Sequence, residues 1–362
     1  MNPNHRTIVL TGGGTAGHVT PNLALAPLLM ERGFRIEYVG SKDGIERSLC
    51  EEAGISYHSI ATGKLRRYAS WQNLIDPFRL LQGIAQAVSL LGKLDVRLVF
   101  SKGGFVGVPV VVGAKLKGIP SVLHESDLSP GLANRLCIPL ASRICVSYAE
   151  TLASLPKNAN AQHTGTPIRR SLLEGDRTRG IERFEIFGDR PTILVFGGSL
   201  GAIAINDSVR ELVRLGSNDL QFIHVCGAGN LDPQLDDYPS YRQFEYLHSE
   251  FADALACCDL VISRGGANSL AELAATRKPA IIVPLPLDVS RGDQIENAQR
   301  HAQKGYGVVL AQSELSAVRL RKEIEETLAR KEELTAAMQR DSLLDSAERL
   351  ASLIEELIER SG

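Results

Sequence analysis

The chain has 362 residues, of which 44% are apolar and 23% charged, and its formal net charge is −2. This length predicts two domains with separate cores, and the near-neutral charge argues against a generally basic nucleic-acid-binding protein. The six cysteines lack C-x-x-C and zinc-ligand spacing, so we expect them to be reduced. The N-terminus lacks a signal core, and no apolar run reaches the roughly 18 residues of a membrane span. We therefore expect a cytoplasmic protein.

The first predicted strand, Ile8–Leu10, runs into a glycine-rich loop, Gly12–Gly17. Thr20 and Pro21 then predict the start of a helix. The backbone N–H groups of such a loop, together with the positive end of the helix, form an anion site. His18 lies at the mouth of the loop, where it is either a titratable group beside a charged ligand or a histidine that caps the helix.

The same glycines also fit the G-x-G-x-x-G fingerprint of dinucleotide-binding proteins, which pairs with an acid that binds a ribose. Glu37 lies at about the expected distance, but inside the next strand, Arg35–Val39, and not at its end. We therefore favour an exposed strand residue for Glu37. A nicotinamide-dependent oxidoreductase remains an alternative.

Apolar runs of strand length alternate with helical patterns along the rest of the chain. The further runs are Val96–Phe100, Ser121–Leu123, Ile144–Val146, Thr192–Phe196, Gln221–Val225, Leu260–Ile262 and Ala280–Val283. This alternation indicates parallel sheets with crossover helices. Because the glycines after Leu10 and Phe100 are echoed after Phe196 and Ile262, we predict two similar doubly wound α/β domains, with a hinge within residues 163–170.

The stretch Lys64–Trp71 combines three cations, Lys64, Arg66 and Arg67, with the only tryptophan of the chain, Trp71. Basic residues beside interfacial aromatic residues suit an anionic membrane surface, at about 1 kcal/mol per cation. The alternative is a solvated loop whose tryptophan packs on its own domain.

Two further helices are predicted from apolar stripes. The first begins at Asp76–Pro77, and the second, the last helix of the chain, begins at Asp345–Ser346. The stripe of the first runs through Phe78, Leu81, Ile84 or Ala85, Val88 and Leu91, and that of the second through Leu350, Leu353, Ile354 and Leu357.

The second half of the chain contains two more glycine loops after strands, Gly197–Gly201 and Gly265–Gly266. Glu272 follows the latter, within the first turns of a helix. Its carboxylate either favours the helix dipole alone, by about 1 kcal/mol or less, or accepts the two hydroxyls of a ribose. Gln294 and Asn297 are three residues apart at another helix start, so both can face a cleft and bind sugar hydroxyls.

Seven stretches in one order carry a resemblance that covers nearly the whole chain. They are GGGTAGHVTPN (Gly12–Asn22), SKGGFVGVP (Ser101–Pro109), GIPSVLHESDLSPGLANR (Gly118–Arg135), TGTPIR (Thr164–Arg169), FGGSLGA (Phe196–Ala202), SRGGANSLAE (Ser263–Glu272) and RGDQIENA (Arg291–Ala298). Together they resemble the MurG family of peptidoglycan glycosyltransferases. The resemblance implies a GT-B fold, in which two Rossmann-like doubly wound parallel-sheet domains face an interdomain cleft.

The implied domains are residues 1–164, which take the acceptor and face the membrane, and residues 165–342, which bind UDP-N-acetylglucosamine (UDP-GlcNAc). A C-terminal helix, about residues 343–360, would pack back on the first domain. The implied enzyme is an inverting hexosyltransferase that needs no metal or other cofactor, in keeping with the absence of a D-x-D motif. It would join GlcNAc to the 4-hydroxyl of the muramyl sugar of lipid I, forming lipid II.

The resemblance also implies roles for single residues, carried over by matching position. The catalytic residues would be His18, Glu125 and Asp127. Donor contacts would come from Thr15, Gly17, Arg169, Gly198, Ser199, Gly201, Gly266, Glu272, Gln294 and Asn297. The acceptor would meet Gly14, Gly104 and Asn134, and the membrane would meet Lys64, Arg66, Arg67 and Trp71.

The implied partners are lipid I, anionic phospholipid and cell-wall or divisome proteins, with no nucleic acid, at the cytoplasmic face of the bacterial plasma membrane. Two alternatives remain at this point. One is another UDP-sugar enzyme of the same architecture, such as a 2-epimerase or a glycolipid glycosyltransferase. The other is a non-catalytic nucleotide- or lipid-binding subunit.

Overall fold

A computed structural model of the chain describes residues 6–63, 72–198, 202–216, 219–340 and 345–360. The chain divides into two units. Unit 1 comprises Met1–Arg169 together with Asp345–Gly362, and unit 2 comprises Arg170–Leu344. The boundary between the units therefore lies five residues beyond the expected one at residue 164.

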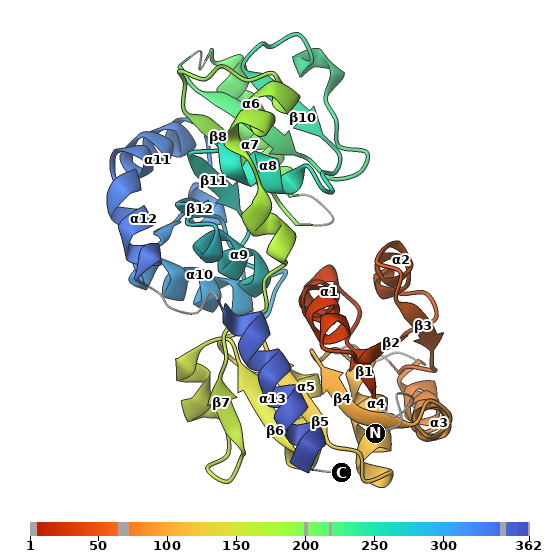
Figure 1. Cartoon of the computed structure of the whole chain (residues 1–362). Helices are drawn as coiled ribbons and strands as arrows, with labels where there is room; N and C mark the ends of the chain where they lie inside the picture. Colours follow the sequence, from red (N-terminus) through yellow and green to blue (C-terminus); the bar gives the residue numbers. More distant parts are fainter. Residues whose placement is uncertain (1–5, 64–71, 199–201, 217–218, 341–344, 361–362) are drawn as a thin grey trace. The chain divides into compact units, whose positions relative to one another are not determined.

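Unit 1 is built on a parallel sheet of seven strands in the order β3-β2-β1-β4-β5-β6-β7 (Figure 1). The strands are β1 (Thr7–Thr11), β2 (Arg35–Gly40), β3 (Ser56–Ser59), β4 (Val96–Ser101), β5 (Ser121–Glu125), β6 (Arg143–Val146) and β7 (Ala161–His163). The helices are α1 (Ala16–Glu31), α2 (Ile45–Glu52), α3 (Gln72–Lys93), α4 (Gly107–Leu116), α5 (Leu132–Cys137) and α13 (Ser346–Arg360).

Unit 2 repeats this topology with six parallel strands in the order β10-β9-β8-β11-β12-β13. The strands are β8 (Thr192–Phe196), β9 (Gln221–Val225), β10 (Tyr241–Phe244), β11 (Leu260–Ser263), β12 (Ala280–Ile282) and β13 (Gly307–Val309). The helices are α6 (Arg177–Phe184), α7 (Ile203–Arg214), α8 (Phe251–Cys257), α9 (Ala267–Ala275), α10 (Asp293–Gln303), α11 (Ala317–Ala329) and α12 (Lys331–Gln339). Two doubly wound α/β sheets confirm the predicted fold class.

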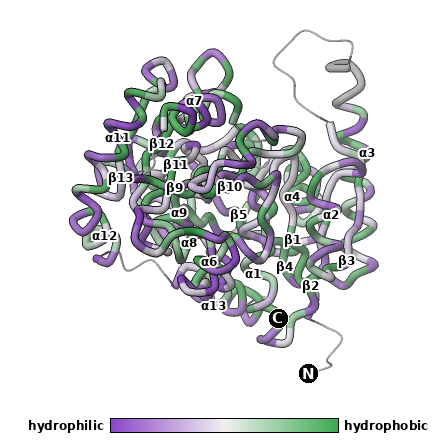
Figure 2. The backbone as a smooth tube through the Cα atoms, turned by 90° about the horizontal axis from the view of Figure 1, so that it is seen from above, coloured by the Kyte–Doolittle hydropathy of each residue, from purple (hydrophilic) through white to green (hydrophobic). Residues whose placement is uncertain are grey.

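Each strand predicted from an apolar run is present, and the strands that were missed lie at sheet edges. Those are β3 and β7 in unit 1 and β10 and β13 in unit 2. An edge strand has one neighbour and is less buried, so its sequence needs no continuous apolar run. Figure 2 shows hydrophobic residues along the central strands β1 and β4, whereas α11 and α12 alternate between hydrophobic and hydrophilic residues.

Two predicted helix starts were wrong, because a proline lies inside each helix and not at its first turn. Helix α1 begins at Ala16, five residues before Pro21, and α3 begins at Gln72, five residues before Pro77. In α1 the side chain of Val19 is fully buried. This packing stabilises a helical turn before Pro21 and outweighs the low helix propensity of the proline. As a result His18 lies in the first turn of α1 and not in a loop.

The interpretation of Glu37 as an exposed strand residue was also wrong, since its side chain is 1% exposed. Its Oε2 lies 2.8 Å from Nε2 of His58 on β3, and its Oε1 lies 2.5 Å from Nη2 of Arg35. The unpredicted strand β3 lies beyond β2 and supplies the histidine that covers the carboxylate. Glu37 is therefore occupied inside the sheet and cannot bind a ribose.

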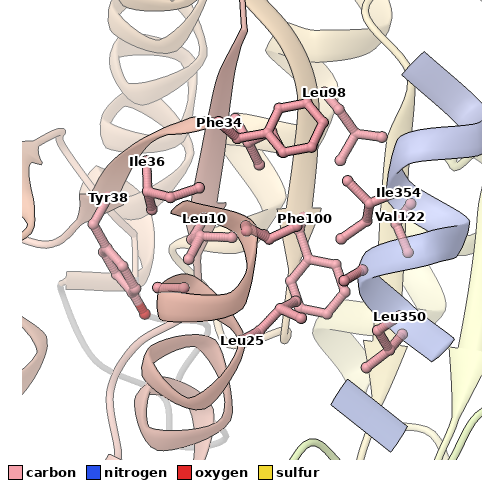
Figure 3. Packing of buried hydrophobic residues seen from close by; sticks show 14 of the residues in the cluster. Leu10, Leu25, Phe34, Ile36, Tyr38, Leu98, Phe100, Val122, Leu350 and Ile354 are labelled. Carbon is pink, nitrogen blue, oxygen red and sulfur yellow. The ribbon is translucent and has the colours of Figure 1, made fainter. Parts of the chain in front are cut away.

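The last helix, α13, completes the core of unit 1. Leu350 and Ile354 are fully buried and pack in one cluster with Leu10 and Phe100, and Figure 3 shows both side chains directed into that cluster. Arg32, just after α1, binds Glu348 at 2.7 Å and Glu355 at 3.0 Å. The predicted start and apolar face of this helix are confirmed.

All six cysteines are buried and none forms a disulfide. A search of the helices in the described ranges found none with the length and apolar character required to cross a bilayer.

Candidate functional site

In unit 1, the predicted site residues lie where strands β1, β4 and β5 end. The strand order reverses between β1 and β4, and ligands of doubly wound sheets bind outside the carboxyl ends of the strands at such a switch point. The loops after these three strands contain the glycine-rich loop Gly12–Gly17, the pair Gly103 and Gly104, and the segment from Glu125 to Asn134.

His18 is half-buried and held by the glycine loop. Its Nδ1 lies 3.1 Å from the carbonyl oxygen of Gly13 and 3.2 Å from the hydroxyl of Thr15. A carbonyl only accepts hydrogen bonds, so this contact favours the tautomer with a proton on Nδ1 and the lone pair on Nε2. That tautomer is the one in which Nε2 can accept a proton from a substrate.

Buried polar side chains form hydrogen bonds with the backbone at the glycine loop. The hydroxyl of Tyr38 donates to the carbonyl of Gly12 at 2.7 Å, and Nδ2 of Asn22 donates to the carbonyl of Thr11 at 3.1 Å. The buried Glu46 accepts the backbone N–H of Gly14 at 3.4 Å. Sequence reasoning missed these residues, because two of them come from β2 and α2, away from the motif.

The loops after β1 and β4 are in close contact, which accounts for the glycine at position 104. Gly104 has φ of +77°, and a Cβ there would lie 2.5 Å from the carbonyl oxygen of Gly13. No other residue type fits this backbone conformation and this spacing without displacement. Gly14 and Gly104, predicted for the acceptor, are thus brought to the same edge.

Glu125 has both carboxylate oxygens in hydrogen bonds. Oε1 accepts the backbone N–H of Asp127 at 3.0 Å, while Oε2 accepts the backbone N–H of Gly131 at 2.9 Å and Nδ2 of Asn134 at 2.8 Å. Glu125 and Asn134 are buried and Asp127 is half-buried. The structure brings these three predicted residues together, and Glu125 fixes the loop that carries the other two.

A fully buried lysine lies at the same edge. Nζ of Lys102, just after β4, lies 2.7 Å from Nδ1 of His124 and also donates to the hydroxyl of Ser126. Nε2 of His124 contacts the carbonyl oxygen of Gly165 at 2.8 Å. Burial lowers the pKa of Lys102 to about 7 and holds the pKa of His124 well below its ordinary value. The signal for Lys102 is a lysine at a strand end directly before two glycines.

In unit 2, the site residues lie at the ends of β8, β11 and β12. A Cβ on Gly265 would collide with the backbone of Gln294, so the turn after β11 is packed directly on the start of α10. Asn297 is fully buried, and its Nδ2 lies 3.5 Å from the carbonyl oxygen of Gly265. Asn297, predicted for the donor sugar, thus holds this turn.

The remaining donor residues of unit 2 surround the same turn. Gly266 caps the N-terminus of α9, and Glu272 lies half-buried in that helix. Oε1 of Gln294 accepts the backbone N–H of Leu285 at 3.1 Å. Arg264 donates to the carbonyl of Val283 at 3.0 Å, so the loop after β12 is tied to the turn after β11.

The other predicted residues lie at the end of β8, at the boundary between the units, or outside the described ranges. Gly198 follows β8 with φ of +89°, and Arg169 is the last residue of unit 1. Ser199, Gly201 and the predicted membrane residues Lys64, Arg66, Arg67 and Trp71 lie outside the described residues. Within the described ranges, no group of three or more His, Cys, Asp or Glu side chains is placed to hold a metal ion.

Two family descriptions match the two halves of the chain. The glycosyltransferase family 28 N-terminal domain matches residues 8–146. The glycosyltransferase family 28 C-terminal domain matches residues 192–357. The first match covers the sheet of unit 1 through β6, and the second runs from β8 into α13.

Curated relatives extend over almost the full length. The UDP-N-acetylglucosamine–N-acetylmuramyl-(pentapeptide) pyrophosphoryl-undecaprenol N-acetylglucosamine transferase of Lachnoclostridium phytofermentans is 46% identical over 97% of this chain and 99% of its own. The protein of the same name from Clostridium perfringens is 44% identical over 96% of this chain and 97% of its own.

Solved structures show the same architecture. The crystal structure of Acinetobacter baumannii MurG superposes with a TM-score of 0.76 at 25% identity, covering 97% of this chain and 99% of that one. The calicheamicin glycosyltransferase CalG4 gives a TM-score of 0.72 at 18% identity, covering 99% of both chains, and shows the fold alone.

Proposed function

Since the chain belongs to the MurG family of N-acetylglucosaminyltransferases, we propose that it transfers GlcNAc from UDP-GlcNAc to lipid I, forming the lipid intermediate used in peptidoglycan synthesis. The observation that carries this proposal is the setting of His18 at the end of β1. Its Nδ1 is held 3.1 Å from the carbonyl of Gly13, which leaves Nε2 as the proton acceptor of the neutral ring.

His18 accepts the proton of the muramyl 4-hydroxyl while that oxygen attacks the anomeric carbon from the face opposite UDP. One displacement of this kind inverts the anomeric configuration and gives a β1,4 bond. A general base contributes about 10²–10⁴-fold to such a step. Asp127, carried on the loop that Glu125 fixes, stays a candidate for the transfer centre.

The donor nucleotide is assigned to unit 2. Glycine turns follow β8 and β11, and the turn after β11 leads into the N-terminus of α9, where backbone N–H groups and the helix dipole favour phosphate. Glu272 accepts the ribose hydroxyls and Gln294 orients the GlcNAc. In unit 1, by contrast, the N–H of Gly14 already donates to the buried carboxylate of Glu46, so this amide is not available to the donor phosphates.

Departure of UDP is supported by these amides, by the helix N-terminus and by Arg169, without a divalent metal. Fixed donors of this kind stabilise the charge that develops on a leaving group.

The acceptor is embedded in a membrane, and unit 1 carries a surface that fits one. Phe78 and Leu81 on α3 are 74% and 65% exposed, and they follow the predicted membrane segment Lys64–Trp71 along the chain. Apolar side chains near basic residues favour an anionic bilayer surface. We place the enzyme at the cytoplasmic face of the plasma membrane, where cell-wall or divisome proteins are its expected partners.

An assay of UDP release tests the proposal. Purified enzyme is given UDP-GlcNAc and a soluble lipid I analogue, with and without EDTA, and parallel reactions contain UDP-glucose or UDP-galactose. We expect release only with UDP-GlcNAc and the acceptor together, at a rate that EDTA does not change. Turnover of UDP-GlcNAc without an acceptor would instead indicate a 2-epimerase or hydrolase, and loss of turnover in EDTA would contradict metal independence.

A further inference from the structure

The buried lysine at the end of β4 lacks a negatively charged partner at contact distance. Lys102 is 1% exposed, and its ammonium group contacts a histidine ring and a serine hydroxyl. No carboxylate of the described residues lies within 4.0 Å of it. Removing an ammonium group from water costs free energy, so a buried lysine at this strand end calls for a function.

The groups that face Lys102 leave its charge uncompensated at short range. His124 on β5 is buried and neutral, and burial raises the pKa of Cys145 on β6 to about 12, so that thiol is neutral as well. Glu125 and Asp127 act on the ammonium only through space. Both oxygens of Glu125 accept hydrogen bonds from the loop that follows it.

Lys102 also adjoins the glycine loop. Its backbone N–H donates to the carbonyl of Thr11 at 2.9 Å, and its Cβ would lie 3.3 Å from a Cβ on Gly12. A diphosphate at this edge would meet backbone N–H groups, but it would also meet the negative charges of Glu46, Glu125 and Asp127. The positive charge of the protonated Lys102 offsets that repulsion.

We propose that Lys102 is an electrostatic binding residue for the diphosphate of the acceptor, and that the acceptor binds with uptake of a proton from solvent onto this lysine. This inference rests on the proposed function, which assigns a diphosphate-linked acceptor to unit 1. Because its side chain is buried, Lys102 attracts the diphosphate through space and does not contact it.

The direction of the pH dependence follows from linkage. The pKa of Lys102 is about 7 in the protein without ligand, and a bound anion raises it because the charged form is favoured. Acceptor binding is therefore strongest below pH 7, where Lys102 is already charged. It weakens above pH 7, where binding must also bring in a proton.

The test compares Lys102→Met with Lys115→Met, which removes an exposed lysine from α4 of the same unit. The KM for a soluble lipid I analogue is measured at pH 6.5 and pH 8.5. We expect the wild-type KM to rise at least fivefold between these values, and Lys115→Met to behave alike. Lys102→Met should show a KM about tenfold higher at pH 6.5 and little change with pH, while its KM for UDP-GlcNAc stays within twofold.

An acceptor analogue with an uncharged link in place of the diphosphate separates charge from structure, because the tenfold difference between Lys102→Met and wild type should then vanish. A difference that persists, or an unchanged KM with the charged analogue, would overturn the proposal.

Calorimetry of the wild type in two buffers of different ionisation enthalpy covers the case of a misfolded variant. It should show proton uptake with the charged analogue at pH 7.5, and no uptake also overturns the proposal. Failure of the wild type to use the acceptor at all would count against the proposed function instead.

Discussion

At the scale of single residues, some predicted site residues of the two units hold loops in place, whereas others keep part of their side chain exposed. Glu125 was predicted to be catalytic, yet its carboxylate accepts three N–H groups. Asn297, predicted to touch the donor sugar, is fully buried. His18 and Glu272 are half-buried, so the sharpest tests of residue function fall on these two.

Replacement of His18 by alanine should lower kcat by about 10²–10⁴-fold, because the acceptor hydroxyl loses its base, with little change in either KM. Steady-state kinetics with the lipid I analogue measures this. His248→Ala, which removes an exposed histidine of unit 2, is the matched control. Near-normal turnover of the His18 variant would exclude the histidine as base and direct attention to Asp127.

Replacement of Glu272 by alanine should raise the KM for UDP-GlcNAc about 10- to 100-fold, since hydrogen bonds to a charged group contribute about 1.5–3 kcal/mol. The KM for the acceptor should not change. Glu272 lies beyond the first turn of α9, where the effect of the helix dipole has fallen off. If its carboxylate has a structural role only, the variant would instead lose stability at an unchanged KM. Kinetics and urea unfolding of the same sample distinguish the two outcomes.

At the scale of elements, the sequence predicted the central strands and the last helix but not the edge strands or the helix starts. Runs such as Thr192–Phe196 are buried on both faces and read as continuous apolar segments. Tyr241–Phe244 lies at an edge and reads as mixed. Pro21 and Pro77 mislead because each lies inside a helix, whose start is decided by tertiary packing.

The packing of α13 can be tested by stability. Ile354→Ala should lower the free energy of unfolding of unit 1 by about 2–5 kcal/mol, as removal of a buried side chain leaves a cavity. Glu359→Ala, at an exposed position of the same helix, should change it little. Urea denaturation followed by circular dichroism measures both. Equal stability of the two variants would show that α13 does not contribute to the core.

The exposed apolar residues of α3 give a second test at this scale. Replacing Phe78 and Leu81 by serine, or Trp71, Arg66 and Arg67 by serine together, should abolish binding to vesicles that contain anionic phospholipid. Turnover of a soluble acceptor should be kept. Leu116→Ser, which changes a leucine 68% exposed on the same unit, is the control. Vesicle binding that survives both sets of changes would place the membrane surface elsewhere.

At the scale of the whole molecule, two sheets that share the order of six strands carry different side chains at the ends of those strands. The motifs predicted this, since the glycine loops recur at corresponding strand ends. The supports of those loops could not be predicted. Glu46 and Lys102 make contacts between segments far apart in the chain, and a single sequence does not show which residues such side chains contact.

The return of the chain to unit 1 has a consequence for biosynthesis. Residues 170–344 are continuous, so this half can fold as soon as it leaves the ribosome. The half translated first must wait, because Leu350 and Ile354 of its core are made only after residues 170–344. A nascent chain stalled or cleaved before residue 345 would therefore contain a folded unit 2 and a unit 1 whose core lacks α13. We expect quality-control proteases to cleave such a chain in unit 1.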